Sequence, residues 1–173
     1  MQIQVLWVQS FWTVAIQEIN MRFYAMGNYY LSSIQQGIQA AHALGEMFNQ
    51  YSYGDSPVGR TLRDWAANHK TMVLLNGGNS ADLSDLWTLL SDERNTLYPV
   101  SKFSEDEQSL DGALTCVAIL LPESMYEAKW FPPNPNDEFS KGYWWYTRLD
   151  GGNQILGWEA ELLTVLKRLP LAK

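Results

Sequence analysis

Strand-like and helix-like segments alternate along the chain, and this alternation constrains the fold more than any other feature of the sequence. Apolar or aromatic runs predict strands at 23–31, 71–75, 97–103 and 113–121. Helical spacing of apolar side chains predicts helices at 32–50, 60–68, 81–90 and 158–169. Such an order is typical of an α/β domain, and we predict a mixed central sheet of about four strands that is flanked by helices.

Two regions stand outside this alternation. Residues 1–20 begin with alternating apolar and polar side chains but then lose the pattern, so we interpret them as an N-terminal appendage. Residues 21–173 then form a single α/β domain. Within it, the segment 123–157 is rich in proline and aromatic residues, and we interpret it as an insertion before the last helix.

The charge of the chain weakens a nucleic-acid role. The net charge is -7, the isoelectric point is about 4.7, and no segment concentrates the 12 basic residues. Phosphate contacts need Lys and Arg side chains. Cys116 is the single cysteine, so no intrachain disulfide and no cysteine zinc cluster can form. Its place in an apolar run predicts a buried thiol and fits a reducing, cytoplasmic compartment.

The longest apolar stretch, Val5 to Ile19, is interrupted by polar residues and is too short to cross a bilayer. We therefore expect no membrane contact. The two histidines lack a spaced carboxylate partner, so we also expect no metal and no other cofactor. His69 ends a predicted short helix, where a cation suits the helix dipole.

The predicted helix 32–50 carries the first candidate site. Ser32 is expected to cap it in a capping box with Gln35. A stripe of polar side chains lies within about 60° on this helix; it consists of Gln35, Gln39, His42 and Glu46. We expect a buried face made of Ile34, Ile38, Ala41, Gly45 and Phe48. The stripe is either an ordinary solvated face or a site for a polar ligand, since glutamine both donates and accepts hydrogen bonds.

The acidic segment 104–111 is the second candidate. Glu105 and Asp106 stand near the hydroxyl groups of Ser109 and Thr115, which suits acid–base chemistry if these groups face a pocket. The alternative is a solvated acidic loop. Further upstream, the residues at 76–79 are typical of a turn, and Ser80 is expected to cap the helix that follows.

The aromatic run Tyr143 to Tyr146 also leaves two readings open. It is either a half-buried strand, with alternate rings on its two faces, or a platform on which a base stacks.

A family resemblance rests on the helix at 32–50. Residues 39–43 (Gln-Ala-Ala-His-Ala) match the second half of a Lys-x-Ala-Ala-Gln-x-x-His-Ala motif, and the chain here resembles the type II peptidyl-tRNA hydrolases. The similarity covers residues 21–122 and 158–170. Residues 70–74 resemble that family's second strand, 83–90 its next helix and 97–103 the strand before its catalytic loop. Residues 115–122 resemble its last strand, and 161–169 its final helix.

The resemblance implies hydrolysis of an aminoacyl or peptidyl ester of tRNA, or of a related nucleotide. The family's catalytic-loop aspartate falls near Glu105, its loop threonine near Ser109, and its helix lysine on Gln35. In this reading the side chains have three roles: orienting water (Glu105 or Asp106), binding the developing oxyanion (Ser109 or Thr115), and holding the substrate (His42, Gln35, Gln39 and Lys70).

The alternative is a non-catalytic binding protein that reuses this fold, such as a phage accessory factor. Its partner would be a small polar ligand or a protein. The surroundings of the site discriminate between the two hypotheses. A basic rim formed by Arg60, Arg63 and Lys70 favours the enzyme, whereas an acidic or flat surface favours the binding protein.

Overall fold

The central element of the fold is a four-stranded mixed sheet. The computed structural model describes residues 20–148, 151–155 and 157–172, so all but Asn20 of the predicted appendage lies outside the described residues. The strands stand in the order β2-β1-β4-β3; they are β1 (Met21–Gly27), β2 (Thr71–Asn76), β3 (Val100–Ser104) and β4 (Leu114–Pro122). Strand β1 pairs parallel to β2, and β4 pairs antiparallel to β1 and β3. The predicted α/β class with a mixed sheet is confirmed.

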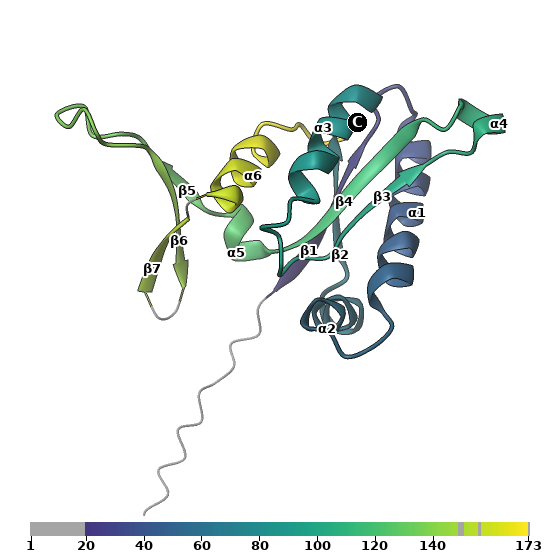
Figure 1. The fold of residues 1–173 in the computed structure, drawn as a ribbon, viewed down its shortest axis with the longest axis horizontal. Helices are drawn as coiled ribbons and strands as arrows, with labels where there is room; N and C mark the ends of the chain where they lie inside the picture. The colour runs from purple at the N-terminus through teal and green to yellow at the C-terminus, as the bar shows by residue number, and fades with distance from the viewer. Residues whose placement is uncertain (1–19, 149–150, 156, 173) are drawn as a thin grey trace, which may run out of the picture.

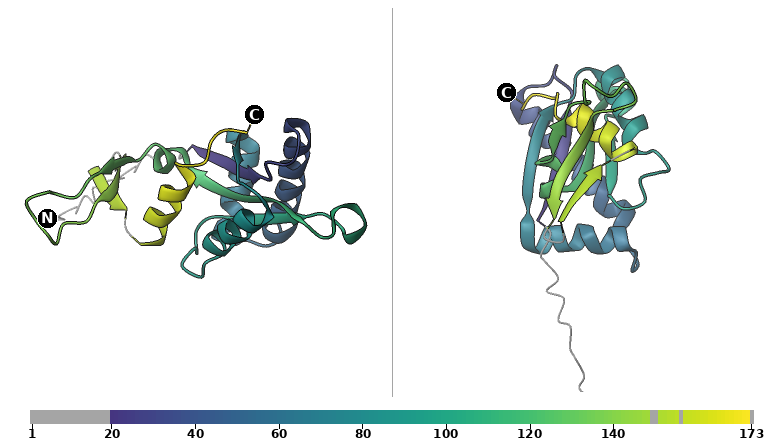
Figure 2. Two further views of the ribbon diagram at one scale, coloured as in Figure 1. Left: turned by 90° about the horizontal axis from the view of Figure 1, so that it is seen from above. Right: turned by 90° about the vertical axis from the view of Figure 1, so that its left-hand side faces the viewer.

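Helices cover both faces of this sheet (Figures 1 and 2). One face carries α1 (Ser33–Tyr51), α2 (Pro57–Asp64) and the π-helical turn η1 (Trp65–His69). The other carries α3 (Ser80–Leu90), α5 (Glu123–Tyr126) and α6 (Trp158–Leu166). The short helix α4 (Glu107–Leu110) projects from the sheet between β3 and β4. In the described part of the chain, no helix is both long and apolar enough to cross a membrane.

The alternation of side chains along the central strands builds two separate cores. In β1, Phe23 and Ala25 point to the α1 face, whereas Tyr24 and Met26 point to the α3 face. Strand β4 repeats this arrangement with a three-residue set on each face: Cys116, Ala118 and Leu120 on one side, and Val117, Ile119 and Leu121 on the other. Because successive side chains of a strand point in opposite directions, these two strands need apolar cover on both faces.

The predicted buried face of α1 is wrong except at Phe48, which is half-buried and packs against the core. Ile34 is 76% exposed and Ile38 is 49% exposed. The residues that face the sheet are Gln36, Gln39, Ala40, Ala43 and Met47. This second arc has helical spacing as well, and its two alanines let the helix axis approach the sheet closely. The predicted capping box is confirmed, since the Ser32 hydroxyl accepts from the Gln35 backbone N–H and the Gln35 side chain accepts from the Ser32 N–H.

The observed elements differ from the prediction in several places, of which three bear on the site. The side chain of Asn79, not Ser80, caps α3, because it accepts the N–H groups of Ala81 and Asp82. Strand β1 stops at Gly27, since the chain turns at Asn28, whose carbonyl accepts from the Leu31 N–H. The acidic segment 104–111 is only partly a loop, because Asp106 caps the helical turn α4.

The segment predicted to be an insertion contains a second sheet of strands β5 (Lys129–Phe131), β6 (Tyr143–Arg148) and β7 (Gly151–Ile155). The predicted strand at the aromatic run is thus confirmed. Trp144 packs toward the domain, where its indole N–H donates to the Thr164 hydroxyl of α6 at 2.9 Å. The rings of Phe131 and Tyr143 stack with centroids 5.5 Å apart. Whether a base stacks here stays a prediction.

The orientation of α1 can be tested by a pair of truncations. Met47→Ala removes a fully buried side chain and is expected to lower the free energy of unfolding by about 2–5 kcal/mol. Ile34→Ala, in the same helix, is expected to change it by less than about 0.5 kcal/mol. Urea denaturation measures both values. A larger loss for the Ile34 variant would contradict the observed orientation.

Cys116 gives a second test of the core. Burial raises the pKa of its thiol to about 12, so almost no thiolate forms at pH 8. We expect the native protein to react with Ellman's reagent at least about a hundredfold more slowly than the protein in guanidinium chloride. Equal rates in the two conditions would show that the thiol is accessible in the native state.

Candidate functional site

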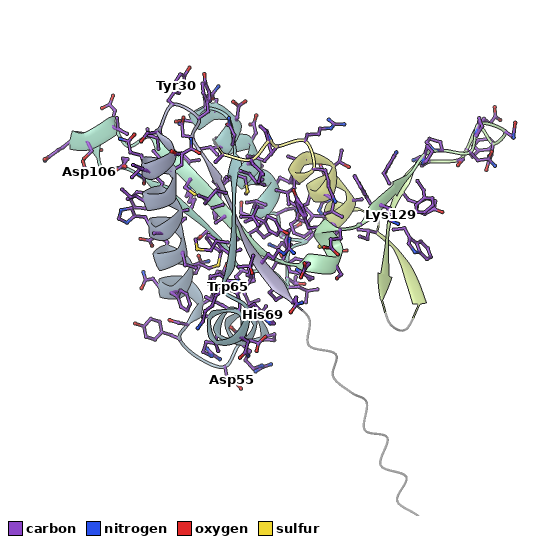
Figure 3. The ribbon with its side chains drawn as sticks, turned by 180° about the vertical axis from the view of Figure 1, so that it is seen from behind. Tyr30, Asp55, Trp65, His69, Asp106 and Lys129 are labelled. Carbon is purple, nitrogen blue, oxygen red and sulfur yellow. The ribbon has the colours of Figure 1, made fainter. Side chains whose placement is uncertain are left out.

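Most of the candidate polar side chains lie near one edge of the sheet, whereas Lys70 lies at the opposite edge. Strands β1, β2 and β3 run in the same direction, so their C-terminal ends and the start of β4 meet at the first of these edges. In α/β folds, ligands bind at this kind of edge. We call it the site edge. Figure 3 shows Tyr30 and Asp106 near it, whereas Asp55 and His69 lie near the opposite edge.

Three residues from three elements form a hydrogen-bonded relay at the site edge. The amide Nε2 of Gln39 donates to Oε1 of Glu105 at 2.5 Å. The Thr115 hydroxyl lies 3.3 Å from Gln39 Oε1 and 3.3 Å from the carbonyl oxygen of Phe103, which lets it donate to either. Gln39 and Thr115 are only 6% and 1% exposed. The relay therefore holds the half-buried Glu105 carboxylate in a fixed place.

A β-bulge directs Thr115 into this relay. Phe103 pairs with Cys116 and Ser104 pairs with Leu114, so Thr115 is an extra residue on β4. The bulge interrupts the alternation of side chains. Thr115 and Cys116 consequently both point to the α1 face, whereas Leu114 packs against the core on the α3 face.

His42 lies next to the relay on the outer side. It follows Gln39 by about one helical turn on α1, and its ring stacks on that of Phe103, with centroids 4.5 Å apart and an interplanar angle of 15°. His42 is exposed and Phe103 is half-buried. An aromatic pair thus joins α1, about one turn after Gln39, to β3, two residues before Glu105.

The structure places two other predicted catalytic residues in a local structural role. The carboxylate of Asp106 accepts the Ser109 backbone N–H at 2.6 Å and caps α4. This backbone hydrogen bond, with a weaker one from the Ser109 side chain, lowers the pKa of Asp106. Asp106 and Ser109 are therefore engaged with each other.

The structure does not bring two of the predicted substrate-binding residues to the relay. The Gln35 side chain is held in the capping box by Ser32. Lys70 has a left-handed backbone conformation, with φ of 57°, at the end of η1. It precedes β2 and so lies at the edge opposite the site edge, about 20 Å away along a six-residue strand.

Sequence analysis missed two polar residues of the site edge. Asn28 is 6% exposed, and its amide donates to the Ser80 hydroxyl at 3.1 Å. That hydroxyl in turn donates to the Leu114 carbonyl. Gln36 is 5% exposed and donates to the Leu31 carbonyl, while its Oε1 is buried without a hydrogen-bond partner among the described residues. The signal for Asn28 was a polar residue directly after a buried strand.

The cations considered for a basic rim lie elsewhere. Arg60 donates to the Asp55 carboxylate and Arg63 donates to the Ser52 carbonyl, both in the α2 region at the opposite edge. Among the described residues, no group of three or more His, Cys, Asp or Glu side chains is placed to hold a metal ion. The rim expected of the enzyme is therefore not formed by Arg60, Arg63 and Lys70.

Comparison with known proteins adds no family assignment. Neither protein-family models nor curated proteins gave a match to this sequence.

The relay can be tested through stability. Gln39→Leu leaves the hydroxyl of Thr115 and the carboxylate of Glu105 without their amide partner, so we expect the free energy of unfolding to fall by about 1–3 kcal/mol. Gln50→Leu, at an exposed position of the same helix, serves as the matched control and should change it by less than about 0.5 kcal/mol. Chemical denaturation measures both. Equal stabilities of the two variants would argue against the relay.

Proposed function

We propose that the chain is a binding protein that reuses a fold like that of the type II peptidyl-tRNA hydrolases, and that it holds a planar ligand with an amino group at the site edge. The observation that carries this proposal is that buried Gln39 holds the Glu105 carboxylate, about one turn of α1 from the exposed ring of His42. Such a site matches the faces and edges of a nucleobase.

The chemistry of each group supports this ligand class. Gln39 engages Oε1 of Glu105, and the second carboxylate oxygen is left to accept hydrogen bonds from an amino group of the ligand. The His42 ring offers a face for stacking. A carboxylate repels phosphate groups, so we infer that the favoured ligand is a nucleoside or another uncharged base-bearing molecule.

The engaged side chains favour binding over ester hydrolysis. Hydrolysis needs donors that are aimed at the developing oxyanion. Thr115 is 1% exposed and uses its hydroxyl inside the relay, and Ser109 is tied to Asp106. Arg60, Arg63 and Lys70, the cations proposed for contacts with tRNA, lie at the opposite edge.

Hydrolysis of an ester of tRNA is the second candidate function, and one observation favours it. Gln39, Glu105 and Thr115 come from distant parts of the chain and meet in one hydrogen-bonded group. The described strands and helices also follow the alternating order that the sequence pattern predicts. In this candidate Glu105 orients the attacking water.

A pair of nucleosides tests the binding proposal. Guanosine and inosine differ by one amino group, and we expect guanosine to bind about tenfold more tightly, because a hydrogen bond to a charged group contributes about 1.5–3 kcal/mol. Glu105→Gln should abolish this difference. Glu107→Gln, which changes an exposed carboxylate nearby, should preserve it. Calorimetry measures the affinities, and equal affinities of the wild-type protein for both nucleosides would contradict the proposal.

The same variants separate the two candidates. With N-acetylaminoacyl-tRNA as substrate, binding alone predicts no release of the acylated amino acid above the buffer rate at micromolar protein. Release by the wild-type protein that is lost in Glu105→Gln and kept in Glu107→Gln would instead establish the hydrolase.

A further inference from the structure

A concave region lies on the α3 face of the sheet, opposite the face that carries the relay. The α3–α6 groove, as we call it, has a volume of about 680 Å³, which is in the range of small-molecule sites. It lies between α3, α6 and the turn after β2. Its lining comprises Tyr29, 76–78, Asp82, Asp85, Leu86, Leu89, Glu161, Val165, Leu169 and Pro170.

The C-terminal segment fixes one wall of this groove. The Pro170 carbonyl accepts the Asn76 N–H at 2.8 Å, and the Ala172 N–H donates to the Leu74 carbonyl at 3.0 Å. Leu171 forms an antiparallel bridge with Leu75. These bonds fasten the segment 170–172 along the free edge of β2, so the groove is bounded by hydrogen-bonded backbone.

The lining of the groove combines apolar and acidic side chains. Its apolar part includes Leu86 and Leu89 of α3, together with Val165 and Leu169. Three exposed carboxylates also belong to the lining, whereas no Lys or Arg side chain is among the described lining residues. Such a combination is complementary to a molecule with an apolar body and a positive charge.

The three carboxylates differ in how far they are engaged. Asp82 accepts the Asn79 N–H in the capping box of α3, and Glu161 lies 3.7 Å from Arg94. Asp85 is exposed and forms neither a hydrogen bond nor an ion pair within the described structure. Asp85 is therefore the carboxylate that is available to a ligand.

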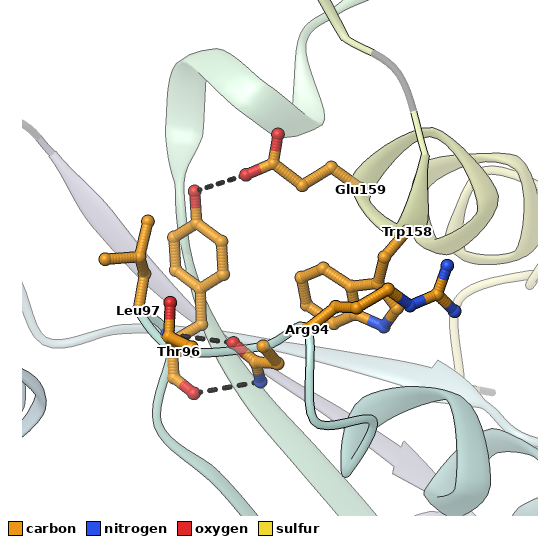
Figure 4. Close-up of a pocket in the computed structure, with 7 residues that line it drawn as sticks. Arg94, Thr96, Leu97, Trp158 and Glu159 are labelled. Atoms are coloured by element: carbon orange, nitrogen blue, oxygen red, sulfur yellow. Dashed lines mark hydrogen bonds between the residues drawn. The ribbon is translucent and has the colours of Figure 1, made fainter.

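A second pocket does not offer this combination (Figure 4). It has a volume of about 210 Å³ and is lined by Arg94, Tyr98, Trp158 and Glu159, among others. Its charged groups already have partners, because Arg94 donates to Asp92 at 2.7 Å and the Tyr98 hydroxyl donates to Glu159 at 3.2 Å.

We propose that the α3–α6 groove binds a small organic amine, with the ammonium group beside Asp85 and the apolar body against Leu86, Leu89 and Val165. This site is separate from the one under "Proposed function", because the relay lies on the α1 face of the sheet. Binding in the groove should not depend on Glu105.

Three matched probes test the inference: 4-phenylbutylamine, 4-phenyl-1-butanol and 4-phenylbutyrate, which share a body and differ in charge. We expect the amine to bind about fivefold more tightly than the alcohol, and the carboxylate to bind most weakly. Amide chemical shifts in a ¹⁵N-labelled sample should change on α3 and α6. Equal affinities of the three probes, or shifts confined to other elements, would overturn the proposal.

Two variants locate the charge that matters. Asp85→Asn should reduce the affinity for the amine to that for the alcohol and leave the alcohol unaffected. Glu46→Gln removes an exposed carboxylate of α1 on the other face and should leave all three affinities unchanged. An equal loss of amine binding in both variants would show a non-specific effect of net charge and would also overturn the proposal. Glu105→Gln should bind the amine like the wild-type protein.

Discussion

The antiparallel pairing of β1 with β4 is the constraint on which the rest of the structure depends. These two strands form the centre of the sheet, and their side chains supply the apolar cores on both faces. A sheet with two apolar faces is stable only when helices cover both. Ala25 pairs with Ala118, and these two small side chains leave room for α1 to pack closely against the sheet. The arrangement of the helices thus follows from these two strands.

The candidate site arises where this regular pairing is interrupted. If β4 alternated without a bulge, Thr115 would point to the α3 face with Val117. The bulge turns it toward α1, where it meets Gln39. Burial of an amide and a hydroxyl costs free energy unless both are hydrogen-bonded. The relay supplies hydrogen bonds to both groups, and it ends at the Glu105 carboxylate. The buried amide and hydroxyl therefore hold one charged group in place at the surface.

The sequence predicts the elements far better than it predicts the site. Local periodicity suffices for strands such as 113–121, because burial on both faces needs a continuous apolar run. It fails for α1, because the arc that faces the sheet contains two glutamines, whereas the exposed arc carries larger apolar side chains such as Ile34 and Ile38. Gln39 was placed in the polar stripe, yet it is buried, since its partners are 66 and 76 residues away. Lys70 illustrates the same limit, because only the strand direction shows that it lies at the other edge.

The turn after β2 links the two proposed binding regions. A Cβ at Gly77 would lie 2.5 Å from Leu83 Cδ2 and 2.9 Å from Met26 Cβ, so only glycine fits between β1 and α3. Gly78 has a φ of 86°, a left-handed backbone conformation that favours glycine because a Cβ atom strains it. This close passage lets the Gly78 carbonyl accept the Tyr29 N–H and lets Asn28 reach Ser80. Tyr29 is thereby placed at the α3–α6 groove, while Asn28, the residue before it, stays bonded to the backbone of Thr115. The two regions lie on opposite faces of the sheet, and the adjacent residues Asn28 and Tyr29 connect them through this turn.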